Sequence, residues 1–408
     1  MPQNIHLKAA ERELPTLFVE GFFHFFIILV LSFGLIWEQN GLVYLSVLLL
    51  VMINGARLWC RLSLKKVSYS LEMDRFKVFP GESVKLEGEV KGSGLLPIWL
   101  QIGLPLAEGL LPDGKVLSTE ANELLYSGLL WRERLPLDWS LTAKKRGWYK
   151  IGPLSLQSSD LLGFFQQKKV YELSSHLTVF PRIVSLNPLP VPFEEFFGDH
   201  SAKSLLEDPV YPIATRDYQP GRPARFINWK ASLRHNRLQE KVFEPTQRRK
   251  ILLAIDTGGF NQTEAEDAES FEALLEVAAT LALRLDITGS SLGLLSNGLT
   301  LHGKPAVLPL LWGETHLMTM LETLAVMQMA ESQGFAGLLR QSHEFTRGSS
   351  CFYFAKGSDE TKVLAELFNE YRIPVIFILQ NPGVEMPEQM TGRVFKLDEV
   401  HGGGEAFA

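Results

Sequence analysis

The amino-acid sequence predicts a multidomain protein with an N-terminal transmembrane helical hairpin, an all-β sandwich-like domain and a C-terminal α/β open sheet of the Rossmann type. Three observations support this prediction. Two long apolar runs open the chain, short alternating strands fill its middle, and apolar strands alternate with helices in its last third. At 408 residues the chain exceeds one ordinary domain, and its net charge of −6 indicates no polyanion partner for the chain as a whole.

The predicted domain boundaries follow these changes of pattern. We expect a membrane anchor over residues 1–63, with helices at about 17–37 and 41–59, a β domain over 64–185, a basic segment over 186–250 and the α/β domain over 251–408. Only two cysteines occur in the sequence. No disulfide framework is therefore predicted, which fits a reducing compartment.

The two apolar runs predict the membrane anchor. Residues 21–37 and 41–56 contain no formally charged side chain, and only three residues separate them. Extended by a few residues, each run reaches the length of about 20 residues that crosses a ~30 Å hydrocarbon layer. The positive-inside rule places both chain ends in the cytoplasm, because the connecting turn has no Lys or Arg and the flanks carry Lys8, Arg12, Arg57, Arg61, Lys65 and Lys66. A buried hairpin of a soluble core and a cleaved signal peptide are the alternatives.

Residues 67–181 show the two-residue period of β-strands. Apolar and polar residues alternate over 67–73 and 84–90, with a turn at Pro80 and Gly81 between them. Five more short strands are predicted, at 98–104, 124–131, 139–143, 154–157 and 177–180. Seven short strands separated by turns are typical of an antiparallel sandwich.

The last third alternates strands and helices. After a wholly apolar strand at 251–255, the sequence predicts strands at 291–295, 299–302, 351–355, 375–379 and 393–397 and helices at 264–285, 315–330, 337–345 and 359–371. This alternation predicts a mostly parallel sheet with both faces covered. Ligands of such sheets bind at the carboxyl ends of strands, so Asp256 is the most informative residue of this domain. We interpret the glycines that follow His401 as part of a flexible tail.

The segment 216–250 is strongly basic, with ten Lys or Arg against three acids. Three interpretations stay open: internal salt bridges combined with packing, a surface for an acidic protein partner, and nucleic-acid binding. No pattern predicts an enzyme. The sequence has no G-x-S-x-G elbow, and Asp199, His200 and Ser201 are adjacent, so they cannot line up as orienter, base and nucleophile. We expect no catalytic residue.

A spaced motif in the basic segment resembles the hallmark of the bacterial family known as domain of unknown function 58 (DUF58). Its residues are Arg216, Tyr218, Gly221, Arg225, Ile227, Trp229 and Arg234. Upstream, residues 146–153, 160–165 and 179–182 are similar to the β-domain pattern of that family. With the two-helix anchor, the resemblance covers nearly the whole chain.

The resemblance implies that the last domain is similar to von Willebrand factor A domains. It also implies two kinds of partner, a MoxR-type AAA+ ATPase and a membrane protein with a transglutaminase-like domain. The family is associated with chaperone-like assembly or envelope maintenance, and it implies no enzymatic activity for this component.

Two departures from the family patterns matter. Arg222 follows Gly221 where the family often has Asp. The magnesium loop of von Willebrand A domains reads Asp-x-Ser-x-Ser, whereas this chain keeps Asp256 but has Gly258 and Phe260 at the serine positions, and it has Lys356 in place of a later acid. One carboxylate beside a lysine does not give Mg²⁺ its near-octahedral oxygen shell, so we predict no metal and no cofactor. We predict instead a salt bridge between Asp256 and Lys356, the alternative being that Asp256 caps the following helix.

Together these inferences predict a non-enzymatic scaffold or adaptor in the bacterial inner membrane, with two transmembrane helices and cytoplasmic soluble domains. Its von Willebrand A-like domain is expected to bind the ATPase or the client of the ATPase. The predicted partner-binding residues are Asp256, Thr257, Gly258, Gly259, Arg222, Lys230 and Arg237. The alternatives are a hydrolase acting on envelope material and a nucleic-acid-binding protein that uses residues 216–250.

Overall fold

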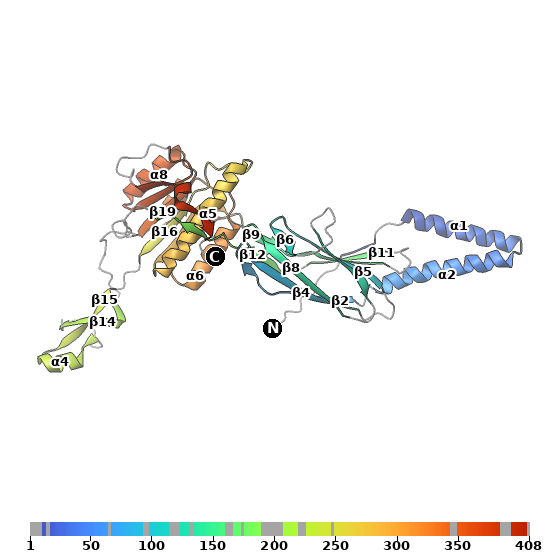
Figure 1. Ribbon diagram of the computed structural model, residues 1–408, viewed down its shortest axis with the longest axis horizontal. Coiled ribbons are helices and arrows are strands. Elements are labelled where there is room, and N and C mark those ends of the chain that lie inside the picture. The colour runs from blue at the N-terminus through green and yellow to red at the C-terminus, as the bar shows by residue number, and fades with distance from the viewer. Residues whose placement is uncertain are drawn as a thin grey trace. The chain divides into compact units, whose positions relative to one another are not determined.

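The chain forms two compact units, Met1–Phe180 and Pro181–Ala408, which we describe one at a time. The computed structural model (Figure 1) describes residues 10–13, 17–63, 67–92, 98–113, 123–130, 134–159, 166–172, 175–188, 207–218, 226–245, 249–342, 349–383 and 393–405.

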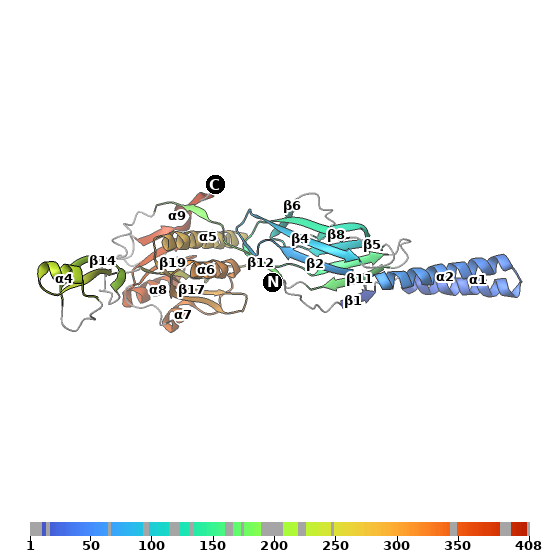
Figure 2. The ribbon, with the colours of Figure 1, turned by 90° about the horizontal axis from the view of Figure 1, so that it is seen from below.

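Two helices dominate the start of the first unit. Helices α1 (Leu17–Ile36) and α2 (Asn40–Ser63) lie side by side in Figures 1 and 2. The turn between them has Glu38 at a positive φ of 50°. Gly34 permits a close approach of the helices, because a Cβ atom there would lie 3.2 Å from the Cβ atom of Leu42. Helix α2 continues beyond its predicted end at residue 59.

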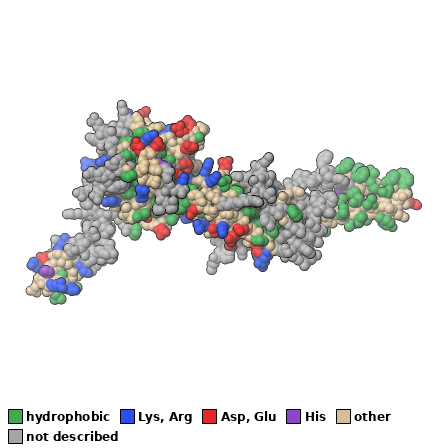
Figure 3. Space-filling view, viewed as in Figure 1, with side chains coloured by type: hydrophobic (Ala, Val, Ile, Leu, Met, Phe, Trp, Pro, Cys, Tyr) green, Lys and Arg blue, Asp and Glu red, His purple; other side chains and the backbone are tan. Residues whose placement is uncertain are grey.

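The apolar side chains of these helices face outward, which Figure 3 shows as a continuous hydrophobic surface. In the part of the chain that the structure describes, one stretch, Asn40–Leu58, is long and apolar enough to cross a membrane, with 19 residues at a mean hydropathy of 1.8. Only 11% of this apolar stretch is buried inside the protein. The shorter apolar stretch His24–Ile36 lies in α1. The number of spans and their orientation stay predictions.

The rest of the first unit is built of β-sheets. One antiparallel sheet has the order β2 (Val67–Met73), β4 (Ser83–Gly92), β8 (Arg134–Ala143), β6 (Leu110–Asp113). A second has the order β1 (Ala10–Glu13), β11 (Gln166–Tyr171), β10 (Leu154–Ser159), β5 (Ile98–Pro105), β7 (Glu123–Leu130). A small third sheet contains β3 (Lys77–Val78), β12 (His176–Val179) and β9 (Gly147–Lys150).

Alternate residues of the two larger sheets share one core. Val84, Leu86 and Val90 of β4 and Leu100 and Ile102 of β5 are buried in the same cluster. This is the inward-facing half of a two-residue period, with the other half exposed along β4. The strand period predicted for this region is therefore present, although the sequence did not predict β1, β3, β6, β9 or β11.

In the second unit, residues 207–218 and 226–245 form a small hairpin with a short helix, which we call the basic arm. Strands β14 (Glu207–Asp217) and β15 (Gln239–Pro245) pair antiparallel, with helix α4 (Trp229–His235) between them. The Asn228 side chain accepts a hydrogen bond from the Ala231 amide at 3.2 Å and caps α4. Asn236, at a φ of 51°, ends α4 in the left-handed conformation.

The remainder of the second unit is an α/β domain. Its sheet has the order β18 (Pro305–Leu311), β17 (Ser291–Leu299), β16 (Lys250–Ile255), β19 (Ser349–Ala355), β20 (Val375–Leu379), β21 (Val394–Lys396). All neighbours pair in parallel except β17 and β18. The helices are α5 (Ala265–Ile287), α6 (Glu314–Val326), α7 (Phe335–Gln341), α8 (Asp359–Glu370) and α9 (Leu397–Val400). The predicted, mostly parallel sheet is thus present.

Two predictions in this domain are wrong. The hairpin partner of β17 is β18, not residues 299–302, because β17 continues to Leu299 and the turn follows it. The glycines after His401 are not a flexible tail, since β22 (His401–Glu405) pairs antiparallel with β13 (Val184–Leu186). A Cβ atom at Gly402 would lie 2.7 Å from the Ser185 carbonyl oxygen, so only glycine permits this close pairing.

Candidate functional site

The Asp256 carboxylate lies at the carboxyl end of β16, where the sequence predicts it, and its side chain is buried. Its Oδ1 accepts hydrogen bonds from the Gly258 amide and from Asn297 Nδ2, both at 2.8 Å. Its Oδ2 accepts one from the Tyr353 hydroxyl at 2.6 Å. Both oxygens of a buried charge are therefore compensated by donors.

Parallel register brings these donors together. Ile255 of β16 stands opposite Ser296 of β17 and Phe354 of β19, so the next residue, Asp256, lies beside Asn297. Asn297 in turn accepts a hydrogen bond from the Thr257 amide through Oδ1 at 2.8 Å. One amide side chain thus fixes both the carboxylate and the first residue of the loop that follows β16.

Tyr353 supports the hydrogen-bond network around Asp256 from the buried interior of the sheet. Its ring is fully buried, with ring centroids 5.5 Å from Phe335, 6.0 Å from Phe368 and 5.5 Å from Phe377. Burial, and secondly the Asp256 charge, raise the pKa of the Tyr353 hydroxyl well above its ordinary value. The phenol therefore keeps its proton and acts as a donor to the carboxylate.

The predicted salt bridge between Asp256 and Lys356 is wrong. Lys356 Nζ lies 2.7 Å from Oδ2 of Asp267, in the first turn of α5, and that oxygen also accepts the Asn261 amide at 2.6 Å. The ammonium is satisfied by a carboxylate that comes from the helix instead of the strand. The alternative prediction also fails, because Glu264 occupies the N-cap of α5, whereas Asp256 bonds its own loop.

The Asp267 carboxyl responds to opposing effects. Burial raises its pKa. The hydrogen bonds from Lys356 and from the Asn261 amide, together with the charge of the ammonium, lower the pKa by more than burial raises it. The net pKa lies below the ordinary value. Asp267 therefore stays ionised and ties the loop after β16 to the loop after β19.

The loop that follows β16 forms the surface at the carboxyl end of the sheet. We call residues 258–263 the edge loop. Asp256 and Thr257 are buried, so of the four loop residues predicted to bind a partner only Gly258 and Gly259 reach the surface. Gly259 has a φ of 83°, which favours glycine at the bend. Asn261 and Gln262 are exposed beyond it.

The magnesium site that the resemblance implies does not fit these side chains. Both Asp256 oxygens already accept hydrogen bonds, and Lys356 brings a positive charge to the adjacent loop. Among the described residues, no group of three or more His, Cys, Asp or Glu side chains is arranged to hold a metal ion.

The family-type motif lies in the basic arm and partly holds it together. Arg216 Nε lies 2.6 Å from Oε1 of Glu240, whose side chain is fully buried. Ile227 is buried and bridges to Glu240 across the hairpin. This pair supports the internal salt-bridge interpretation for Arg216. Gly221, Arg222 and Arg225 lie outside the described residues.

Other motif residues face solvent. Trp229 is 65% exposed and its helical neighbour Leu233 is 85% exposed. Lys230, Arg234 and Arg237 are exposed as well, and Arg237 Nη1 lies 3.1 Å from Asp217 Oδ2. Basic side chains cover much of this arm in Figure 3. Its aromatic and aliphatic residues are therefore not all core anchors.

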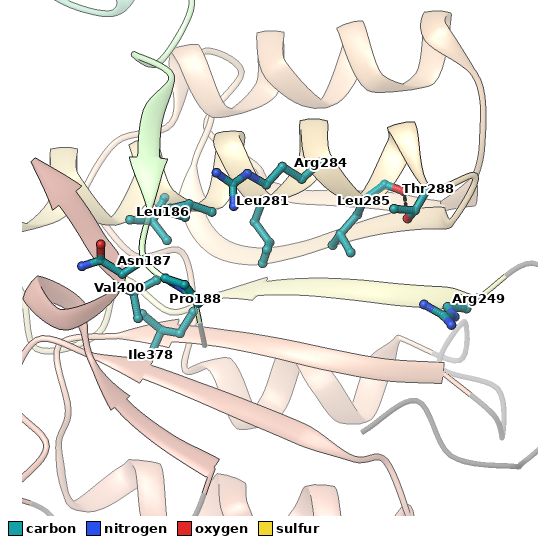
Figure 4. A pocket seen from close by; sticks show the side chains of 11 residues that line it. Leu186, Asn187, Pro188, Arg249, Leu281, Arg284, Leu285, Thr288, Ile378 and Val400 are labelled. Carbon is teal, nitrogen blue, oxygen red and sulfur yellow. Dashed lines mark hydrogen bonds between the residues drawn. The ribbon is translucent and has the colours of Figure 1, made fainter. Parts of the chain in front are cut away.

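A cavity of about 380 Å³ lies between α5 and the sheet (Figure 4). Its lining is mainly aliphatic, from Leu281 and Leu285 of α5, Ile378 of β20 and Leu186. Arg249 and Arg284 lie apart in Figure 4 and do not converge on one point. None of Asp256, Asn297, Tyr353, Asp267 and Lys356 is among the residues that line this cavity.

Sequence reasoning missed three members of the network, Asn297, Tyr353 and Asp267. Asn297 had a usable signal, because aligning the ends of parallel strands puts it next to Asp256. Tyr353 sits within an apolar strand and looks like a core residue. Asp267 sits among four acids near the start of α5, so its role depends on tertiary packing.

Replacing Asp267 by Asn should loosen the edge loop. We expect a loss of about 1–3 kcal/mol in unfolding free energy, because Lys356 and the Asn261 amide lose a charged acceptor. The stability from Asp267 is fully present above the ordinary Asp pKa of about 3.9 and is lost as pH falls through the lower folded value. Urea unfolding of the full chain measures the change in unfolding free energy, and hydrogen exchange of residues 257–264 measures the loosening of the loop. Glu266→Gln, an exposed change in the same helical turn, should have little effect, and an equal effect would contradict this assignment.

Comparison with known proteins agrees with the motif. Residues 214–347 match the family model described as "Protein of unknown function DUF58". The chain is 23% identical over 304 residues to the uncharacterized protein YeaD of Bacillus subtilis, covering 71% of this chain and 70% of that protein.

Similarity to solved structures is low. The major pilin subunit BcpA of Bacillus cereus matches with a TM-score of 0.22 and 9% identity, over 29% of this chain and 41% of the pilin. The sporulation control protein Spo0M of Bacillus subtilis matches with a TM-score of 0.17 and 14% identity, over 28% and 49%. The chain thus spans less than half of either structure. The motif of the basic arm thus lies within the stretch of this chain, residues 214–347, that matches the DUF58 family model.

Proposed function

We propose that this protein is a non-enzymatic, membrane-anchored adaptor whose α/β domain binds a partner protein through the edge loop. The partner that the family resemblance implies is a MoxR-type AAA+ ATPase or its client, with a transglutaminase-like membrane protein as a further component. A von Willebrand A-like role for the α/β domain is part of this proposal.

Membrane anchoring is supported by the surface chemistry of α1 and α2. A soluble core helix would be mostly buried, whereas Phe22, Leu48 and Val51 are 67%, 64% and 65% exposed. The polar side chains bond to the carbonyls of their own helix, as Ser32 does to Ile28, Ser46 to Leu42 and Asn54 to Leu50. This internal pairing is what a hydrocarbon environment demands. Two spans with cytoplasmic ends remain the proposal.

The observation that carries the adaptor proposal is the fixed edge loop. The network around Asp256 and the pair of Lys356 with Asp267 hold its backbone at the carboxyl end of the sheet, where open α/β sheets bind ligands. A loop ordered in advance loses little entropy on binding a protein. The donors around Asp256 satisfy the carboxylate and do not position it to attack a substrate, which favours binding over hydrolysis.

Membrane topology gives the first test. We expect activity from a cytoplasm-specific reporter fused after Ala408, because the basic flanks retain both chain ends in the cytoplasm. Its periplasm-specific counterpart, fused at the same position, should be silent. Activity of the periplasmic reporter alone would exclude a cytosolic ATPase as the partner.

Partner binding gives the second test. Gln262→Trp adds bulk to the exposed edge loop and should lower the affinity for the co-expressed MoxR-type ATPase at least tenfold, because it blocks the contact surface. Gln341→Trp adds the same bulk to an exposed position at the end of α7 and should leave the affinity unchanged. The measurement is co-purification of the full chain, followed by titration in detergent. Equal affinities of both variants and wild type would refute the loop as the contact, and wild-type protein that retains no ATPase would refute the partner.

A further inference from the structure

The outer face of α4 carries two adjacent stripes of different chemistry. Trp229 and Leu233 are one helical turn apart, and so are Lys230 and Arg234, one residue further on. All four side chains are exposed, whereas Ser232 on the other face is buried and accepts the Gln239 amide at 2.9 Å. An apolar stripe therefore lies beside a basic stripe on one face of the helix.

This face is also rigidly presented. The Asn228 cap fixes the start of α4, Ser232 ties its middle to β15, and the pair of the half-exposed Arg216 with the buried Glu240 joins the two strands of the hairpin. A large aromatic and a large aliphatic side chain held in water are unfavourable unless a partner covers them. Trp and Arg together are typical of the centre of protein interfaces.

Among the described residues, helix α8 presents an exposed surface of matching chemistry. Its inner face is buried through Leu364, Leu367 and Phe368. Its outer face carries more acids than bases, with Lys362 half-buried among them, and has one exposed apolar side chain, Val363, which is 50% exposed. The exposed acids around it are Asp359, Glu360, Glu366 and Glu370.

Charge complementarity connects these two faces. Segment 216–250 has an excess of seven positive charges in a chain whose net charge is −6, so the rest of the chain is strongly acidic. Opposite potentials steer two copies together and fix their register. The stripe of Lys230 and Arg234 would face the acids of α8, with Trp229 and Leu233 packed against Val363.

We propose that α4 of one copy binds the outer face of α8 of a second copy, and that the exchange is reciprocal in a two-fold dimer. This goes beyond the proposed function, because it concerns association between copies of this chain and leaves the edge loop to the partner protein. One contact of a seven-residue helix is smaller than a stable interface of about 1,000 Å² requires. Two equivalent contacts double the area, and attachment to one membrane raises the effective concentration.

The test uses the full chain in detergent, with mass measured by sedimentation across a concentration series. The arm variant, Lys230→Glu with Arg234→Glu, should raise the dimer dissociation constant about tenfold or more, and so should the helix variant, Glu366→Lys with Glu370→Lys. Leu233→Ala should weaken the dimer without changing its charge. Lys144→Glu with Lys145→Glu, an equal change at exposed lysines in the β unit, should leave it intact.

Mixing the arm variant with the helix variant distinguishes a lost contact from a misfolded arm. In the mixed dimer, one contact joins the Glu side chains of the arm variant to the Lys side chains of the helix variant, and the other contact is the wild-type one. The mixture should therefore dimerise more tightly than either variant alone. A chain carrying all four substitutions should restore both contacts and return the dissociation constant to near the wild-type value. A monomer at every concentration, a dimer insensitive to the arm variant, or no recovery in the fourfold variant would each overturn the proposal. Loss of the dimer with retention of the ATPase would leave the proposed function standing.

Discussion

The Asp256 carboxylate is removed from water at the end of β16, and the candidate site depends on the three donors that compensate it. An unpaired buried carboxylate is costly, so Asn297, Tyr353 and the Gly258 amide must stay in place for the sheet edge to be stable. Those donors come from β17, β19 and the loop itself. A single charge therefore couples two strands to the conformation of the edge loop, and Lys356 with Asp267 adds a second tie.

Much of the α/β domain follows from sequence pattern. A wholly apolar strand ending in Asp256, followed by an amphipathic helix, predicts a parallel sheet and places the carboxylate at its binding edge. The partner of Lys356 could not be derived in the same way. Asp256 and Asp267 are both acids near one strand end, and only packing of α5 decides which of them meets the ammonium. Gly402 shows a similar limit, because a glycine run looks like a tail until its pairing with β13 is known.

The basic arm contains an internal salt bridge of the kind that the sequence suggested, beside basic residues that face solvent. Arg216 is half-exposed but holds the hairpin together through its pair with the buried Glu240, whereas Trp229, Lys230 and Arg234 face solvent. Composition alone cannot separate these roles, since both need Arg or Lys next to aromatic residues. Hairpin register separates them, because it decides which side chains point at the neighbouring strand. Residues that hold the arm together and residues that face solvent thus alternate within one short motif that lies in the stretch matching the DUF58 family model.

Hydrogen bonds and an ion pair, without a metal, hold the edge loop. Hydrogen exchange at the Thr257 and Gly258 amides, in full-length protein with EDTA and with excess MgCl₂, measures this most directly. We expect strong and equal protection in both conditions, because Asn297 and Asp256 accept those two amides. Protection that appears only with Mg²⁺ would show that a metal ion organises the loop and would contradict the account.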